Sequence, residues 1–208
     1  MRVLRSRGMR RLRSLHPQPP APRTSVRASL ARPCSTFPPY VLINNAGVAI
    51  YDDLSRADVI AQHLAVNLLG LANVTNAFLP LLKRAKGAIV NNLSANALAP
   101  LPLIPAYSIS KAAAFNMTQS LRVLVAARGV RVHAVLTGLV DTDMTRGLDI
   151  PKASPDTVAR GIFDGVENGQ EEIFPDPMSE SLAQSWRSGA AKALERQYAA
   201  LLDAEPVG

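Results

Sequence analysis

The chain has 208 residues, of which 48% are hydrophobic and 19% charged, and it carries a formal net charge of +7. This length allows one compact domain with a substantial core. The single cysteine, Cys34, excludes a disulfide within the chain, the histidines His16, His63 and His133 lack metal-ligand spacing, and no unbroken apolar run reaches the roughly 18 residues of a membrane span.

The positive charge is concentrated at one end of the chain. Residues 1–40 hold nine arginines and no lysine or acidic residue, whereas the remainder has 14 basic and 16 acidic residues. The body is therefore near neutral and gives no indication of a nucleic-acid or membrane surface.

Residues 1–39 are rich in Arg, Pro and Ser, a composition that buries little apolar surface, so we expect a disordered basic segment. Four interpretations are open for it. They are an organelle transit peptide, a basic arm for nucleic acid or anionic lipid, a tail without function, and an artefactual start in which unrelated sequence is translated.

Strands and helices are predicted to alternate from Tyr40 onward. The apolar run Tyr40 to Asn44 is typical of a buried parallel strand that ends in a turn. A long helix follows over residues 55–86, with Ser55 and Asp58 as a capping box and Pro80 as a kink or division. Gly87 is predicted to end it.

The second half of the body continues the alternation. Strands are predicted at 88–93, 130–138 and 171–175, and helices at 106–128, which Gly129 ends, at 155–168 and at 179–201. This order predicts an α/β fold with a doubly wound parallel sheet over residues 40–208.

Four polar residues stand out by their order and spacing. Ser94 ends a predicted strand, Tyr107 follows thirteen residues later, Lys111 lies four residues beyond it, and Asn67 belongs to the preceding helix. Residues at i and i+4 share one helix face. A tyrosine with its usual pKa of about 10 is a poor base near neutral pH, and a nearby cation favours the phenolate.

With "NNAG" at residues 44–47 upstream, this set resembles the short-chain dehydrogenase/reductase family over about residues 40–202. The resemblance implies a Rossmann-type fold and NAD(P)-dependent hydride transfer between nicotinamide and an alcohol or ketone. By the same resemblance, Tyr107 is the acid/base and Ser94 hydrogen-bonds the substrate oxygen. Lys111 holds the nicotinamide ribose, and Asn67 holds a relay water.

Cofactor-binding residues are also implied by the resemblance. Asn44, Ala46 and Gly47 would border the adenine ribose and stabilise the central sheet. In the loop "TGLVDTDMT", Val140 would meet the nicotinamide carboxamide, and Thr142 would bind the carboxamide or the phosphates. Thr137 stands where the family has proline, which we expect to loosen the turn without removing a ligand.

The glycine-rich turn of the family, G-x-x-x-G-x-G, is absent, because Gly8 is the only glycine before Gly47. The strand end that would choose between NAD and NADP is also absent, so the sequence leaves that choice open. We expect a chain that is N-terminally truncated or has an aberrant N-terminus, an exposed edge at the Tyr40–Asn44 strand, and weak or no dinucleotide binding.

Three functions are compatible with these patterns. The first is a short-chain oxidoreductase acting on an apolar alcohol or ketone, the second is a catalytically impaired remnant that serves as a structural or pairing subunit, and the third is a basic recruiting arm on a passive body. For the first we expect a homo-oligomer formed through the two long helices, with no nucleic-acid or membrane partner. We expect it in the cytoplasm, or in an organelle if residues 1–39 are a transit peptide.

Overall fold

The computed structural model describes residues 40–204, with side chains as far as Leu201. The segment 1–39, expected to be disordered, lies outside the described residues. Four parallel strands form one sheet in the order β1 (Val41–Asn44), β2 (Ala88–Asn92), β3 (Arg131–Val135) and β4 (Glu172–Ile173). The predicted α/β fold with a parallel sheet is confirmed.

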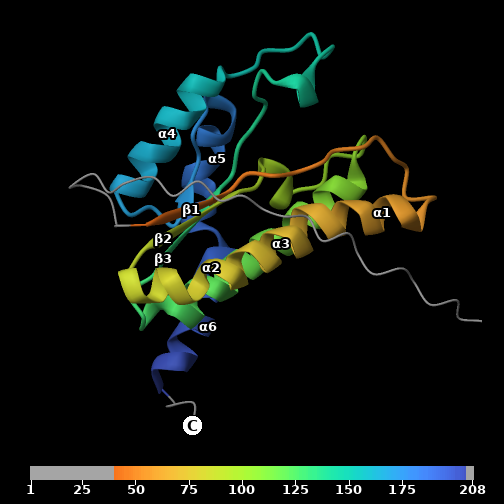
Figure 1. Cartoon of the computed structure of the whole chain (residues 1–208). Coiled ribbons are helices and arrows are strands. Elements are labelled where there is room, and N and C mark those ends of the chain that lie inside the picture. The colour runs from red at the N-terminus through yellow and green to blue at the C-terminus, as the bar shows by residue number, and fades with distance from the viewer. Residues whose placement is uncertain (1–39, 205–208) are drawn as a thin grey trace, which may run out of the picture.

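Helices cover both faces of this sheet. In Figure 1, α1, α2 and α3 run along one face and α4 covers the other. The helical segments are α1 (Ala57–Leu64), the π-helical η1 (Ala65–Gly70), α2 (Leu71–Ala85), α3 (Pro105–Ala126), α4 (Pro155–Glu167), α5 (Pro177–Ser188), α6 (Ala190–Ala204) and the single turns η2 (Ala95–Ala97) and η3 (Asp143–Thr145).

Strand β2 is central and β1 is the edge among the described residues. Ala88, Ile89 and Val90 are at most 1% exposed, as expected for a strand covered on both faces. On β1, Ile43 is 48% exposed, and no strand between residues 40 and 204 other than β2 pairs with it. The predicted edge at this strand is therefore present within the described part of the chain.

The first long helix differs from the prediction in two places. The capping box at Ser55 is wrong: Arg56 is the N-cap, makes no side-chain capping bond, and instead binds Asp58 at 2.5 Å. Pro80 does not divide the helix, because α2 continues through it. Both Pro80 and Asn76 are exposed, so the carbonyl that the proline leaves without a helical partner can face water.

The predicted C-terminal helix is two helices. Gly189 separates α5 from α6 with an extended backbone (φ −76°, ψ 156°). A Cβ at this position would lie 2.8 Å from the carbonyl oxygen of Ser185, so the close turn requires glycine. The prediction missed this break because a single glycine is tolerated inside many helices.

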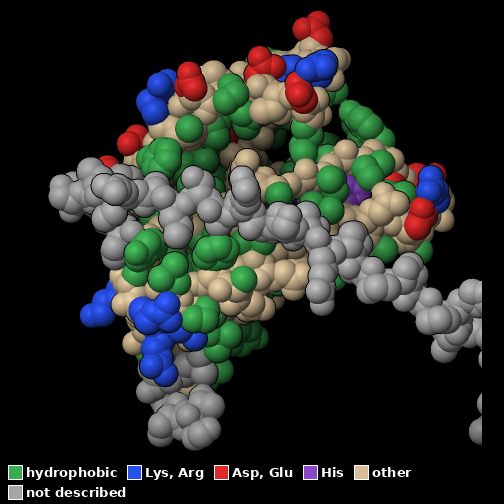
Figure 2. Space-filling view, in the orientation of Figure 1, with side chains coloured by type: hydrophobic (Ala, Val, Ile, Leu, Met, Phe, Trp, Pro, Cys, Tyr) green, Lys and Arg blue, Asp and Glu red, His purple; other side chains and the backbone are tan. Residues whose placement is uncertain are grey.

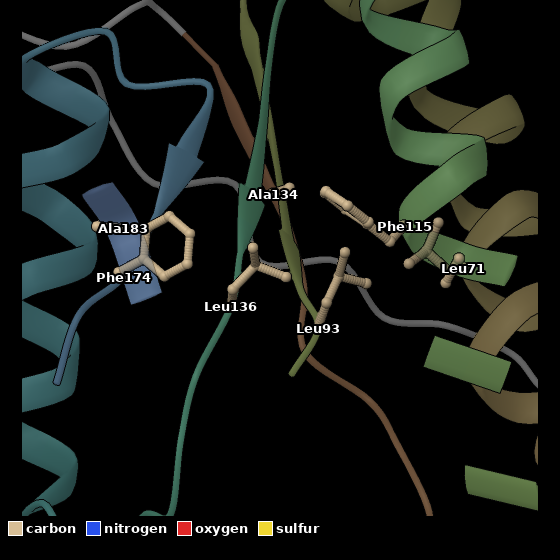
Figure 3. Close-up of a cluster of buried hydrophobic side chains, with 8 residues drawn as sticks. Leu71, Leu93, Phe115, Ala134, Leu136, Phe174 and Ala183 are labelled. Carbon is tan, nitrogen blue, oxygen red and sulfur yellow. The ribbon is translucent and has the colours of Figure 1, made fainter. Parts of the chain in front are cut away.

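A hydrophobic cluster joins both sides of the sheet to α5. Figure 3 shows it beside the strand that carries Ala134, with Leu71 and Phe115 on one flank and Phe174 and Ala183 on the other. Trp186 of α5 meets the Phe115 ring edge-on, with ring centroids 5.3 Å apart. The cluster fixes α3 against the strand ends, and α3 carries two of the predicted site residues.

The continuous helix Ala57–Ala85 has 29 residues and contains an 18-residue window with a mean hydropathy of 1.5, so by length and composition alone it could cross a membrane. Such a helix was not predicted from the sequence, because polar residues interrupt its apolar stretch. A single such helix is weak evidence, and the polar residues His63, Asn67 and Thr75 of this helix are at most 2% exposed. Only 17% of its apolar window is buried, which leaves an apolar helix face open.

Candidate active site

A pocket of about 420 Å³ lies where the strands end. In parallel sheets the carboxyl ends of the strands meet at one edge, where ligands of α/β proteins bind. Figure 2 shows a hollow on this side of the molecule, next to α4. The pocket is lined by Asn45, Gly47, Asn92, Leu93, Tyr107, Lys111, Thr137, Gly138, Val140, Thr142, Met144, Thr145, Pro155, Val158, Ala159 and Ile162.

Tyr107 and Lys111 lie one turn apart on α3, as predicted, and are 8% and 5% exposed. The Lys111 Nζ lies 5.6 Å from the centroid of the Tyr107 ring and donates to the Asn92 carbonyl at 3.0 Å. Helix α3 begins with Pro105, and Asp52 Oδ2 accepts from the backbone N–H of Ala106 at 3.2 Å. The start of the helix, and with it Tyr107, is thus held from a second segment.

Burial governs the protonation of both residues. It raises the pKa of Tyr107 above 10, and a hydrogen bond with Ser94 offsets only part of that effect. Burial lowers the pKa of Lys111 from 10.5 to about 8. The neutral-pH form is therefore a phenol beside an ammonium, rather than the phenolate expected from the cation alone, because desolvation disfavours the phenolate.

Ser94 meets Tyr107 through its side chain. It follows β2, caps the η2 turn by accepting from Asn96 N–H at 3.1 Å, and is 7% exposed. Against the larger effect of burial, hydrogen bonding by the Ser94 side chain lowers the pKa of Tyr107, so these two residues, thirteen positions apart in the sequence, lie close together. The structure thus joins Ser94, Tyr107 and Lys111 into one group.

Asn67 lies in the π-helical segment η1 and is 2% exposed. Its Oδ1 accepts from Val48 N–H at 2.9 Å, and its Nδ2 donates to the Val48 carbonyl at 3.0 Å and to Ser110 Oγ at 2.9 Å. Ser110 Oγ donates in turn to the Tyr107 carbonyl at 2.7 Å. The amide of Asn67 is occupied by protein groups and does not line the pocket.

The five residues predicted to bind the cofactor, besides Tyr107 and Lys111, divide into two groups. Gly47, Val140 and Thr142 line the pocket, whereas Asn44 and Ala46 do not.

Asn44 points toward the helices. Its Nδ2 donates to Thr75 Oγ1 at 3.1 Å and to Asn91 Oδ1 at 2.8 Å, and Asn91 donates to Thr118 Oγ1 at 2.9 Å. These bonds join β1 and β2 to α2 and α3, which agrees with the sheet-stabilising part of the prediction for Asn44.

Asn45, not Asn44, faces the pocket, and sequence reasoning missed it. It accepts from Asn92 Nδ2 at 2.6 Å, so the ends of β1 and β2 are joined by an amide pair on the pocket side. Successive residues of a strand point to opposite faces. The sequence signal for Asn45 was therefore its position immediately after Asn44.

Asp176 is a second residue that the sequence reasoning missed. It is 3% exposed, accepts from Gly138 N–H at 2.8 Å, and caps α5 by accepting from Ser179 N–H at 3.0 Å. The signal was available, since Asp-Pro-x-Ser is typical of a helix start with proline at its first position. Asp176 fastens the turn at Thr137 and Gly138 to α5.

The fold and the grouped side chains are those of a short-chain dehydrogenase. A family model described as short chain dehydrogenase matches residues 39–152, more than half of the chain. The chain belongs to the short chain dehydrogenase family.

Known relatives agree with this assignment. The chain is 33% identical to an 11-beta-hydroxysteroid dehydrogenase-like protein 3 of Arabidopsis thaliana, over 64% of this chain and 46% of that one. It is 38% identical to 2-(S)-hydroxypropyl-CoM dehydrogenase 3 of Xanthobacter autotrophicus, over 58% and 49%. The chain thus spans about half the length of the curated relatives it matches.

Solved structures show the same architecture. A short chain dehydrogenase from Burkholderia cenocepacia in complex with NADP is 34% identical, with a TM-score of 0.67, and the match covers 76% of this chain and 67% of that one. A short-chain dehydrogenase from Sphingobium yanoikuyae in complex with NADPH is 25% identical, with a TM-score of 0.64 and coverages of 74% and 63%.

Proposed function

We propose that the protein is an NAD(P)-dependent oxidoreductase that transfers a hydride between nicotinamide and an alcohol or ketone. The observation that carries the proposal is the buried group of Ser94, Tyr107 and Lys111, of which Tyr107 and Lys111 line the pocket. A proton donor held in a largely apolar pocket beside a second hydroxyl suits proton transfer at a carbonyl oxygen.

The described residues fit the nicotinamide–ribose end of a dinucleotide. The pocket offers a lysine ammonium, the Asn45 amide and the Thr142 hydroxyl for ribose and carboxamide groups, beside the apolar side chain of Val140. Gly47 lies beside the lysine, since a Cβ built on it would be 3.6 Å from the Lys111 Nζ. When bound there, nicotinamide supplies or accepts the hydride.

Each residue of the group has a separate task in this proposal. The Tyr107 phenol gives its proton to the carbonyl oxygen during reduction and takes it back during oxidation. Ser94 donates a hydrogen bond to the same oxygen and stabilises its developing charge. Lys111 binds ribose hydroxyls and keeps a positive charge beside the phenol. Asn67 holds the backbone of Val48, so a relay water near it would bind to backbone groups rather than to its amide.

The names of relatives favour an alcohol or ketone as substrate. They include 11-beta-hydroxysteroid dehydrogenase-like proteins and 2-(S)-hydroxypropyl-CoM dehydrogenase. NADP or NADPH is present in the matched structures from Burkholderia and Sphingobium, which makes NADPH the first cofactor to test.

Titration of the purified chain with NADPH and NADH, followed by nicotinamide fluorescence, tests the proposal. We expect saturable binding that Lys111→Met weakens about tenfold, because a charge-assisted hydrogen bond to ribose is lost. Lys83→Met, which removes an exposed lysine of α2, is the matched control and should leave the affinity unchanged. A folded chain that binds neither dinucleotide would contradict the proposal and favour the alternative of a catalytically impaired pairing subunit.

We also propose a homo-oligomer that packs through the two long helical segments, α1–η1–α2 and α3. Large apolar side chains are exposed on them, including Val66 (36%), Leu69 (55%) and Ile109 (42%). A second copy of the chain would cover such a face with matching apolar residues, as isologous interfaces do.

Leu69→Glu should therefore lower the oligomeric state, measured by multi-angle light scattering, because a buried carboxylate would be left unpaired between the copies. The matched control is Leu201→Glu, at a leucine of α6 that is 64% exposed, which should leave the state unchanged. A wild-type monomer at all accessible concentrations would overturn this part of the proposal.

A further inference from the structure

We infer that His63 is a positioning residue for Tyr107, acting as a single tautomer that binds the loop after β1 and contacts the tyrosine ring. The inference rests on the proposed function, since it gives His63 a place in that site. His63 lies outside the pocket lining and contacts Tyr107 and the loop, so it acts through them.

Both ring nitrogens of His63 are occupied by backbone groups. The residue is fully buried, its Nδ1 lies 2.8 Å from the Val59 carbonyl oxygen, and its Nε2 lies 3.1 Å from the Ile50 nitrogen. A carbonyl can only accept and a backbone N–H can only donate. The ring therefore carries its proton on Nδ1 and a free lone pair on Nε2, and no other protonation state satisfies both contacts.

His63 and Asn67 are one helical turn apart and hold the same loop. Asn67 binds both the N–H and the carbonyl of Val48, and His63 binds the N–H of Ile50. Two side chains of the α1–η1 helix thus take the place of a neighbouring strand for residues 48–50. Gly47 of the same loop lies next to the Lys111 ammonium.

The His63 ring also meets Tyr107 directly. The ring centroids are 6.3 Å apart and the planes are inclined at 75°, which is an edge-to-face contact. The Nε2 atom of the imidazole therefore binds the loop, and the ring contacts the phenol ring of Tyr107. His63 thus links the loop at Ile50 to Tyr107, the residue proposed to transfer the proton. Packing alone would not require this pair of contacts.

Nuclear magnetic resonance tests this without cofactor or turnover, so the inference can fail or stand independently of the proposed function. In ¹⁵N-labelled wild type, His63 should show a protonated Nδ1 and an unprotonated Nε2, and the Ile50 amide should be protected from hydrogen exchange. A proton on Nε2 of His63 would overturn the inference, whatever any variant does.

Variants then separate positioning from packing, with ¹³Cζ-tyrosine spectra as the readout and Tyr107→Phe to assign the signal. In His63→Leu the loop loses its acceptor and admits water, so the titration midpoint of Tyr107 should fall toward its ordinary value of about 10. His63→Gln keeps an acceptor and should restore most of the shift. Lys111 and Asp52, the charged groups that lie nearest Tyr107 on α3, are unchanged in both variants, as are the exposed Asp53, Arg56 and Asp58.

Gln62→Leu, at the exposed neighbouring position on α1, is the matched control and should leave the Tyr107 signal in place. An unshifted Tyr107 midpoint in folded His63→Leu would contradict the inference. If His63→Leu does not fold, His63→Gln and the wild-type tautomer still test the inference. Fast hydrogen exchange of the Ile50 amide in folded His63→Gln, together with an unchanged Tyr107 midpoint, would also contradict the inference.

Discussion

Tyr107→Phe should lower the rate of ketone reduction by about 10²- to 10⁴-fold, the usual contribution of a positioned general acid. The substitution removes one hydroxyl and retains the ring, so the edge-to-face contact with His63 remains. Lys111 keeps its hydrogen bond to the Asn92 carbonyl, and the lining of the pocket is otherwise unchanged. The affinity for NADPH should therefore stay within about twofold of the wild type.

The measurement is steady-state reduction of a panel of cyclic and acyclic ketones, followed by NADPH absorbance. Tyr198→Phe is the matched control, because Tyr198 is 62% exposed on α6 and far in sequence from the site. An equal rate in Tyr107→Phe and wild type would remove Tyr107 from the reaction. An equal and large loss of NADPH affinity would instead assign it a binding role.

The pH profile gives a second check on the same group. Because the pKa of Lys111 is about 8, reduction should decline as pH rises through that value and the ammonium beside Tyr107 is lost. The phenol itself stays protonated there, since its pKa is raised by burial. Lys111→Met should lack this decline.

Unfolding does not explain such a decline. The folded pKa of Lys111 lies below the ordinary 10.5, so the unfolded chain binds more protons between about pH 8 and 10.5. The contribution of this group to the free energy of unfolding therefore rises with pH across that interval. As pH rises through this interval, the reduction rate should therefore fall while the contribution of Lys111 to the free energy of unfolding increases.

Local sequence was sufficient for the order of the elements and for the face that Tyr107 and Lys111 share. Alternating apolar runs and helical segments predict a parallel sheet, and residues at i and i+4 must meet on a helix. The amount of burial was not predictable in this way. It comes from segments far away, such as the loop that bears Asp52, 54 positions from Ala106, and it decides that the phenol rather than the phenolate prevails.

Sequence reasoning misplaced residues whose role is set by the face of the strand or helix on which they lie and by the element that this face contacts. Asn44 and Asn45 are adjacent in "NNAG", yet one amide binds Thr75 and Asn91 beneath the helices and the other lines the pocket. A one-residue shift in a strand exchanges its faces, and the helices that define inside and outside are remote in sequence.

Asn67 presents the same difficulty in a helix. Its partners Val48 and Ser110 lie 19 and 43 positions away, and the π-helical turn that carries it has no simple sequence signature. The sequence predicted that Asn67 is a polar helix residue near the site, but only the tertiary structure shows that its amide binds protein groups. The same applies to His63, whose isolated position in the sequence gave no sign of a role.

Lys192→Met should lower the free energy of unfolding by about 3–5 kcal/mol, because it removes a buried cation from a cluster of carboxylates that includes the buried Glu172. Lys192 lies on α6, and its side chain is 3% exposed. Its Nζ binds Glu171 at 2.7 Å, Glu172 at 2.9 Å and Glu195 at 2.9 Å. Glu172 lies on β4, and its side chain is 4% exposed.

Arg122 of α3 completes this cluster with contacts of 2.8 Å to both Glu172 and Glu195. The three carboxylates approach within 4.8 Å of one another, as metal ligands do, but here the ammonium and the guanidinium bind them. Without Lys192, the three carboxylates would keep their ion pairs with Arg122 but lose those with the ammonium. The cluster thus joins α3, β4 and α6 through ion pairs, and removal of any one charge is expected to lower the free energy of unfolding.

Protonation sets the pH window of this contribution. Burial alone would raise the pKa of Glu171 and lower that of Lys192, but their mutual hydrogen bond and the neighbouring charges reverse both directions. The lowered carboxyl pKa means that its contribution is present above the ordinary 4.5 and is lost as pH falls through the folded value. The raised ammonium pKa means that its contribution is present below 10.5 and is lost as pH rises further.

Urea unfolding followed by circular dichroism at pH 7 measures the effect. Arg56→Met is the matched control, because the Arg56–Asp58 pair is 67% and 55% exposed and such pairs contribute at most about 1 kcal/mol. Lys192→Met combined with Glu172→Met should recover part of the loss, since the more deeply buried carboxylate is removed together with its cation. If Lys192→Met costs no more than Arg56→Met, the cluster is solvated in solution and α6 is held to α3 by apolar contacts instead.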